Sequence, residues 1–275
     1  PHPRKEPRFD GPLTLERLEQ IFQDCVDFTK RPVSLGEGGA CTLTLCYLSG
    51  MVKMERVSDY VLRPLAQDGA LARCGTPRQA MEEMMGGALY NLSAAERTTL
   101  DEAAFDLVAG WCLLFFPGES AVLSLFVGTE EKRSISSPSN ETVLKGSRDA
   151  FVESLRTNTS IVRRHLKAPE LRIREQVVGR QSVTSVDILY IEGLTNPHLV
   201  EQVAAQLADI DIDAVLATGN IEEYIVPAAR TAFPLVQYTE RSDRFCAGLA
   251  EGRGGILIDG LPLGYLAPGV LGDFL

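Results

Sequence analysis

The sequence lacks several motifs that mark common classes of enzyme, and it has few histidines. It contains only three histidines, His2, His165 and His198, and none has a cysteine or carboxylate nearby at metal-ligand spacing. It has no GxxxxGK[ST] phosphate-binding loop, no GxSxG nucleophile motif and no HExxH zinc motif. The sequence therefore predicts a protein that is not an enzyme and that uses neither a cofactor nor a metal ion.

The sequence also has little positive charge and no long apolar run. Its 27 lysines and arginines are outnumbered by 37 aspartates and glutamates, which gives a net charge of −10 at pH 7. An acidic surface repels phosphate backbones, so nucleic acid is not expected as a partner. The longest apolar runs, 111–117 and 121–127, are far shorter than the roughly 20 residues that span a bilayer. We therefore expect no membrane segment in this chain, and we expect its six cysteines, which include no CxxC pair, to be free thiols.

What the sequence does contain is a weak internal repeat. The apolar segment 45–50 (LCYLSG) in the first half of the chain is similar to the segment 188–193 (ILYIEG) in the second half. Each segment ends in glycine and is followed by apolar residues at helical spacing. In the second half, Asn196 and Pro197 provide a helix N-cap and a first helical residue. The pattern predicts a strand followed by a helix in each half.

A second pair of landmarks preserves nearly the same offset between the halves. Residues 94–109 and 241–251 are predicted helices, and each is followed by a strand, a glycine turn and another strand. The offset between the two turn glycines, Gly118 and Gly260, differs by a single position from the offset between Gly50 and Gly193, which end the two apolar segments. We therefore predict an α/β fold of two similar small lobes, each a mixed sheet flanked by helices.

A polar linker and a long helix are predicted to join the two lobes. Residues 128–146 are polar and rich in serine, and they predict an extended linker with one strand near 132–136. Residues 148–167 carry an apolar stripe at helical spacing and predict a long amphipathic helix that ends before Pro169. We place the first α/β subdomain at 10–137 and the second, which includes this connecting helix, at 138–275.

The predicted helix 148–167 carries the first group of candidate binding residues. Its basic face consists of Arg156, Arg163, Arg164 and Lys167, and the first three of these are candidates. Asn158 is a further candidate because the segment 155–158 is rich in side-chain donors. The planar guanidinium of arginine suits carboxylates, so this face suits either the other lobe or an acidic ligand. The simpler explanation, a solvated helix face, accounts for the pattern equally well.

Four more candidates lie near predicted helix starts and strand ends. Glu240 and Arg241 belong to a polar segment before a helix, where local capping explains much of the composition. Glu192 and Asp259 precede glycines at strand ends, where ligands gather in α/β sheets but where tight turns also require glycine. We take all eight residues as candidate contacts between the lobes or with a ligand.

A series of motifs in a fixed order marks the second half. They are 141–148 (ETVLKGSR), 151–158 (FVESLRTN), 178–180 (VGR), 186–193 (VDILYIEG) and 237–241 (QYTER). From about residue 138 to residue 262 the sequence resembles the soluble N-terminal region of the GerA-type A subunits of spore germinant receptors. The first half resembles that family mainly through 47–50 (YLSG) and 62–65 (LRPL). An A-subunit-like stage V sporulation protein is a close relative that shares this region.

The resemblance implies a role without catalysis. It implies two α/β subdomains ahead of a membrane domain, with B- and C-type receptor subunits and a small-molecule nutrient as partners. It places the domain at the spore inner membrane, facing the cytosol, and gives it a part in nutrient sensing or signal transmission during endospore germination. The chain stops where the membrane helices of the family would begin, so we expect an excised domain. The alternative function is that of a two-lobed module that binds a small molecule in the cleft between the lobes.

Overall fold

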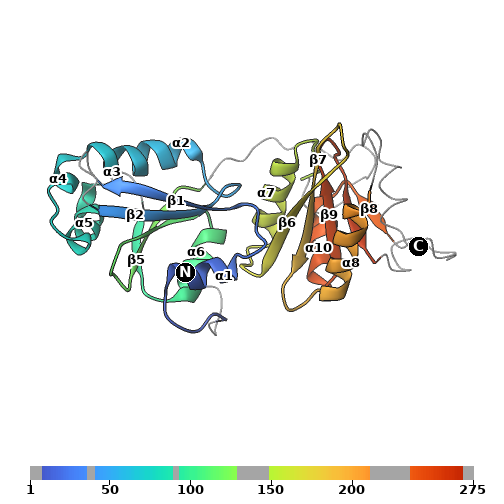
Figure 1. Cartoon of the computed structure of the whole chain (residues 1–275), viewed down its shortest axis with the longest axis horizontal. Helices are drawn as coiled ribbons and strands as arrows, with labels where there is room; N and C mark the ends of the chain where they lie inside the picture. Colours follow the sequence, from blue (N-terminus) through green and yellow to red (C-terminus); the bar gives the residue numbers. More distant parts are fainter. Residues whose placement is uncertain (1–7, 36–40, 89–92, 129–148, 211–235, 269–275) are drawn as a thin grey trace. The chain divides into compact units, whose positions relative to one another are not determined.

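The computed structural model describes residues 8–35, 41–88, 93–128, 149–210 and 236–268, which fall into two units (Figure 1). Unit 1 is drawn from Pro1–Gln23, Asp27–Glu131 and Lys167–Pro169. Unit 2 is drawn from Asp24–Val26, Lys132–Leu166 and Glu170–Leu275. The subdomain boundary predicted at residues 137 and 138, and the strand predicted near 132–136, lie outside the described residues.

Unit 1 contains a five-stranded antiparallel sheet. In chain order its strands are β1 (Phe28–Leu35), β2 (Cys41–Leu48), β3 (Ala94–Arg97), β4 (Trp111–Phe115) and β5 (Val122–Phe126). Their order in the sheet is β1-β2-β4-β5-β3, and each neighbouring pair runs antiparallel. Successive residues near the end of β2 and in the middle of β4 are apolar and buried. Because successive side chains of a strand point to opposite faces, both faces of this sheet carry apolar side chains.

Helices cover both faces of the unit 1 sheet. One face, with Leu43, Leu45 and Tyr47 of β2, packs in one core with a helical layer. That layer consists of α2 (Met54–Val57), η1 (Ser58–Leu62), α3 (Arg63–Gln67), α4 (Gly69–Ala72), α5 (Pro77–Glu83) and η2 (Met84–Ala88). The opposite face contacts α6 (Leu100–Val108), which in turn contacts α1 (Leu15–Ile21).

Unit 2 repeats this plan. Its strands are β6 (Leu171–Val178), β7 (Thr184–Ile191), β8 (Gln237–Thr239), β9 (Gly254–Ile258) and β10 (Gly264–Ala267), in the order β6-β7-β9-β10-β8. The face with Val186, Ile188 and Tyr190 packs on α8 (Pro197–Ala208). The other face packs on α7 (Leu155–His165) and α10 (Ser242–Ala250) (Figure 1).

The predicted repeat is confirmed, down to the register of the strands. Phe28 pairs with Leu48 in unit 1, and their counterparts at the offset of the repeat, Leu171 and Ile191, pair in unit 2. The two sheets have the same strand order when their strands are matched in sequence. Gly118 and Gly260 adopt left-handed φ angles of 79° and 85° in the corresponding turns. The fold therefore consists of two similar α/β lobes.

The sheets are antiparallel, whereas the sequence predicted mixed sheets. All hydrogen-bonded pairs of named strands in the described residues run antiparallel. The reason lies in the helical crossovers. The strands β3 and β4, which α6 connects, run in the same direction, but β5 lies between them and runs in the opposite direction. A parallel crossover therefore exists without a parallel hydrogen-bonded pair.

Two predicted helices are shorter than expected because polar caps start them late. The prediction of a helix over 94–109 was wrong at its start: residues 94–97 form β3, and the side chain of Thr99 caps α6 by accepting from the amide of Glu102. The predicted helix 148–167 is α7, which begins at Leu155 because Ser154 caps it. None of the helices in the described ranges has the length and apolar character needed to cross a membrane.

The two lobes fill the same layer of their cores with different residues. In unit 2 the ring of Phe245 lies over Gly255 and Gly264, where an added Cβ would come within 2.4 Å and 2.6 Å of that ring. The corresponding positions of unit 1, at the offset that relates Gly118 to Gly260, are Ala103, Leu113 and Val122, all buried. In unit 2 a large helix residue thus packs over two glycines of the sheet, whereas in unit 1 a small helix residue corresponds to it and two branched residues correspond to the glycines.

This packing predicts the effect of one methyl group. We expect Gly255→Ala to lower the free energy of unfolding by about 1–3 kcal/mol, because the new Cβ overlaps the Phe245 ring. The double variant Gly255→Ala/Phe245→Leu should recover part of the loss. Urea unfolding measures both effects. Gly69→Ala is the matched control, because its Cβ would meet nothing within 4 Å. A Gly255→Ala variant as stable as the control would contradict this packing.

Buried thiols give both cores a dependence on alkaline pH. Burial raises the pKa of Cys112 in unit 1 and of Cys246 in unit 2 to about 12. An unfolded thiol ionises near pH 9, so above that pH the unfolded state gains free energy by ionising while the folded thiol stays neutral. The contribution of each thiol is therefore complete below pH 9 and is lost as the pH rises toward 12.

We expect the free energy of unfolding to fall between pH 9 and pH 11 by about 1.4 kcal/mol per pH unit for each such thiol. Cys112→Ala should be less stable than the original chain at pH 7 but should decline less steeply across this range. Urea unfolding at a series of pH values, with a reductant present, provides the comparison. Parallel pH curves for the two proteins would be the contrary result.

Candidate functional site

All eight candidate residues of the sequence analysis belong to unit 2. Four of them lie on α7, and the others lie at the ends of β7, β8 and β9. The side-chain contacts described below are with residues of the same unit. Their predicted role as contacts between the lobes or with a ligand stays a prediction.

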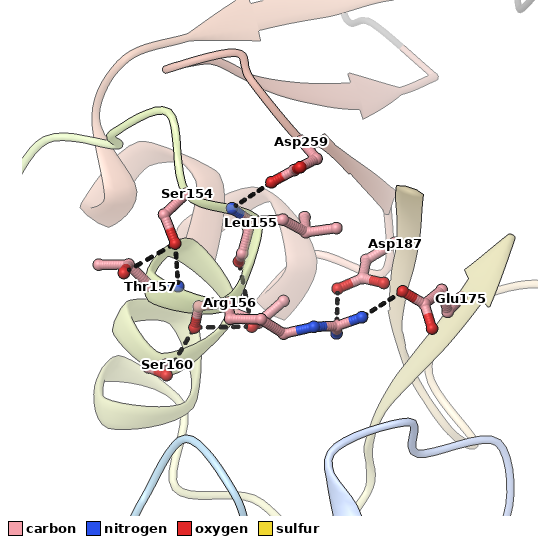
Figure 2. A network of polar contacts seen from close by, with 9 residues as sticks. Ser154, Leu155, Arg156, Thr157, Ser160, Glu175, Asp187 and Asp259 are labelled. Atoms are coloured by element: carbon pink, nitrogen blue, oxygen red, sulfur yellow. Dashed lines mark hydrogen bonds and ion pairs between the residues drawn. The ribbon is translucent and has the colours of Figure 1, made fainter. Parts of the chain in front are cut away.

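Arg156 joins α7 to the sheet (Figure 2). Its Nη1 donates to Oδ2 of Asp187 on β7 at 3.1 Å, and its Nη2 donates to Glu175 on β6. The Asp187 side chain is fully buried, whereas that of Arg156 is 48% exposed. A buried carboxylate needs a compensating charge, and Arg156 supplies one from the first turn of α7.

The first turn of α7 is fixed by its own caps (Figure 2). The amide of Leu155 donates to Oδ1 of Asp259 at 3.1 Å, and the hydroxyl of Ser154 accepts from the amide of Thr157 at 3.4 Å. Asp259 follows β9, so this contact ties the helix start to the end of a strand. A carboxylate at a helix N-terminus also interacts favourably with the helix dipole.

Two of the candidates predicted on this helix, one of them on its basic face, are in fact buried. Arg163 and Asn158 have no exposed surface. The Asn158 amide donates to the carbonyl of Val152 at 2.6 Å and accepts from the amide of Val152 at 2.8 Å. Arg163 donates from Nη1 to the carbonyl of Leu171 at 2.9 Å and from Nη2 to Sγ of Cys25 at 3.4 Å. Of the predicted basic face, Arg156, Arg164 and Lys167 are exposed.

The other three candidates, Arg241, Glu240 and Glu192, also contact residues of unit 2. Arg241 forms a two-pronged ion pair with Asp243, at 3.0 Å and 2.7 Å, which lowers the pKa of Asp243. The carbonyl of Glu240 accepts from the amide of Phe151 at 2.9 Å. Glu192 is half exposed, and its carboxylate is 3.9 Å from Nε of the buried Arg172.

The end of α7 brings together a serine, a histidine and an aspartate, a group that the sequence did not predict. Nε2 of His165 is 3.2 Å from Oγ of Ser242 and 3.5 Å from Oδ2 of Asp149. In a hydrolase triad the serine and the carboxylate approach opposite ring nitrogens. Here both approach Nε2, and the buried Ser242 hydroxyl donates to the carbonyl of Asp149 at 2.7 Å. This arrangement joins the end of α7 to the start of α10 and does not prepare a nucleophile.

Unit 1 contains a buried carboxylate that the sequence analysis also missed. Asp106 on α6 accepts from Nε of Arg97 and from Oγ of Ser124, each at 2.7 Å. The available signal was its place one helical turn after Ala103, on the buried stripe. The corresponding residue of unit 2 is Gly248, packed against Leu266, so this polar group is not repeated.

Among the described residues, no group of three or more histidine, cysteine, aspartate or glutamate side chains is arranged to hold a metal ion. The polar contacts of α7 described above include contacts with β6, β7, the end of β9 and the start of α10. Chemically, these contacts set the position of one helix against the sheet. A small displacement of α7 would have to break several of them together.

Comparisons with known proteins point to one family. The model of one family, described as Bacillus/Clostridium GerA spore germination protein, matches residues 16–275. The chain belongs to the GerA family. The resemblance found in the second half of the sequence is thereby confirmed, and the GerA match extends it through the first half.

Several GerA relatives align over most of the chain. YfkQ of Bacillus subtilis (strain 168), named an uncharacterized membrane protein, is 35% identical over 92% of this chain and 48% of its own length. Spore germination protein KA of the same organism is 32% identical over 90% of this chain and 45% of its own length. Stage V sporulation protein AF, also of that organism, is 30% identical over 83% and 46%. The chain therefore spans about half the length of the curated relatives it matches.

A solved structure shows the same fold. It is the crystal structure of the N-terminal domain of the A subunit of the Bacillus megaterium spore germinant receptor GerK3. It matches with a TM-score of 0.70 and 27% sequence identity over 94% of each chain. The two α/β lobes are thus the architecture of a GerA-family N-terminal domain.

The Arg156 contacts predict a measurable loss of stability. We expect Arg156→Ala to lower the free energy of unfolding by about 1–3 kcal/mol, because the buried Asp187 loses a compensating charge. Adding Asp187→Asn should restore part of that loss, since the second change removes the buried charge itself. Urea unfolding of the single and double variants tests the coupling.

Arg174→Ala serves as the control for this experiment. Arg174 pairs with Glu201, whose side chain is 70% exposed, so its loss should change stability by less than about 1 kcal/mol. An Arg156→Ala variant no less stable than Arg174→Ala would show that Asp187 does not depend on Arg156.

Proposed function

We propose that this chain is the N-terminal domain of a germinant-receptor A subunit and takes part in nutrient sensing or signal transmission during endospore germination. The observation that carries the proposal is the match to the GerK3 A-subunit domain over 94% of both chains. The family match over residues 16–275 and the likeness to spore germination protein KA support it.

The proposal includes a receptor around the domain. Its partners are B- and C-type subunits and a membrane domain of the same family, at the spore inner membrane, with this domain facing the cytosol. Support comes from the relatives, which are about twice as long as the aligned region, and from the name of one of them, a membrane protein.

The domain acts, in this proposal, by changing conformation and not by catalysis. The polar groups of unit 2 support this, because Arg156 and Arg241 bind carboxylates of their own unit. The contacts of Ser242 with His165 differ from those of a hydrolase triad. The alternative, a small-molecule binding module, stays a prediction, and a ligand held by Arg241 would first have to displace Asp243.

Gene deletion in the spore-former that carries this chain tests the proposal. Spores without the full-length gene should respond more slowly, or not at all, to at least one nutrient of a panel of amino acids, sugars and nucleosides. Loss of optical density after nutrient addition measures the response. The original gene, returned at its own locus, should restore it.

Spore yield and heat resistance provide the control, because a germination defect leaves spore formation intact. Normal responses of the deleted strain to every nutrient in the panel would refute the assignment. So would a failure to form heat-resistant spores, which would place the protein in spore assembly instead.

A further inference from the structure

A short segment near the start of the chain is attached to the sheet of unit 2. Asp24–Val26 belongs to unit 2, although the residues on either side of it belong to unit 1. Cys25 forms a parallel bridge with Ile173 on the edge strand β6. The amide of Val26 donates to the carbonyl of Ile173 at 2.9 Å, and the amide of Ile173 donates to the carbonyl of Asp24 at 3.2 Å. We call Asp24–Val26 the clip.

A buried arginine reaches the clip from α7. Arg163 donates from Nη2 to Sγ of Cys25 and from Nη1 to the carbonyl of Leu171, and the same carbonyl is 3.5 Å from the Cys25 thiol. One guanidinium thus contacts both the clip and the first residue of β6. A buried guanidinium needs acceptors, so the closed clip satisfies part of the need of Arg163.

The clip is a small attachment on a large unit. It is three residues long, Val26 is 40% exposed, and Asp24 has a left-handed φ of 56°, which a residue with a side chain adopts less readily than glycine. Segments with few buried contacts open at a lower free energy than the core beneath them. Apart from the buried Cys25, the clip therefore offers little buried surface to hold it on the edge of β6.

Covalent connections link the clip closely to two elements of unit 1. Helix α1 ends at Ile21 and strand β1 begins at Phe28, so two residues separate the clip from α1 and one residue separates it from β1. A change in the position of α7 acts on Arg163, then on Cys25, and then along the chain into β1. This path consists of hydrogen bonds within unit 2 followed by covalent bonds.

We propose that the clip is a two-state element: it opens while the core of unit 2 stays folded, Arg163 holds it closed, and its opening passes a change at α7 to β1. A signalling element requires an equilibrium, here between the open and the closed clip, that both ends of the path are able to shift. The inference goes beyond the proposed function. Its test uses the chain alone, so its failure and the failure of the receptor assignment are distinguishable.

Thiol labelling at a series of low urea concentrations tests the proposal. Cys25 and Cys246 are both free and buried in unit 2, but Cys25 belongs to the clip and Cys246 to the core. An alkylating reagent is added to the folded chain, and the labelling of each cysteine is followed by mass spectrometry of its peptide. Each rate is divided by the rate of the same cysteine in the unfolded chain.

If the clip opens by itself, Cys25 reacts at least about tenfold faster than Cys246 without urea, and its rate rises less steeply with urea. Equal rates with equal urea dependence would overturn the proposal, because the clip would then open only when the core unfolds. This comparison needs no variant, so it holds even where a substitution prevents folding.

Arg163→Gln tests the role of the arginine. We expect the ratio of Cys25 labelling to Cys246 labelling to rise by about tenfold, because the clip loses a charged hydrogen bond. Arg174→Gln is the matched control, since it removes a guanidinium from β6 that pairs with Glu201 and should leave the ratio within about twofold. An unchanged ratio in Arg163→Gln would show that Arg163 does not hold the clip.

Discussion

A guanidinium stays charged at every pH at which proteins are folded, so a fully buried arginine requires its surroundings to supply hydrogen-bond acceptors. In unit 2 that arginine is Arg163, and its acceptors include a carbonyl at the start of β6 and the thiol of Cys25. Apolar packing alone allows a helix to slide or rotate over a sheet. These directional contacts, with those of Arg156 and Asn158, give α7 one position.

The duplicated architecture was accessible from the sequence because it depends on local signals. Apolar strands that end in glycine, and helices that begin at a cap such as Asn196, are short patterns that any copy of the unit must keep. The spacing of Gly118 and Gly260 therefore revealed two lobes. The register of β6 on β7 follows the register of β1 on β2 for the same reason: a one-residue slip would exchange the side chains of the two faces, each of which packs against its own helices.

The candidate site was harder to predict, because burial is a property of tertiary structure. Arg163 and Arg164 are identical neighbours in the sequence, yet one is fully buried and the other is exposed. Arg163 donates to the carbonyl of Leu171 and to the thiol of Cys25, and Cys25 lies far before it in the sequence, so no local pattern reveals these contacts. Likewise, the antiparallel order followed from β5 lying between β3 and β4, and no short pattern encodes that neighbour relation. Family resemblance identified the class of protein but gave no contact geometry.

The two lobes fill one core layer differently: unit 2 has Phe245 over two glycines, and unit 1 has Ala103 with Leu113 and Val122. This difference has an evolutionary consequence. If both lobes descend from one ancestral gene segment, their helices and strands diverged as matched sets, since a phenylalanine would not fit until space beneath it had opened. Grafting α10 onto the sheet of unit 1 would therefore bring an aromatic ring against branched side chains, although the backbones correspond. The two lobes share a backbone fold, but their core elements are no longer interchangeable.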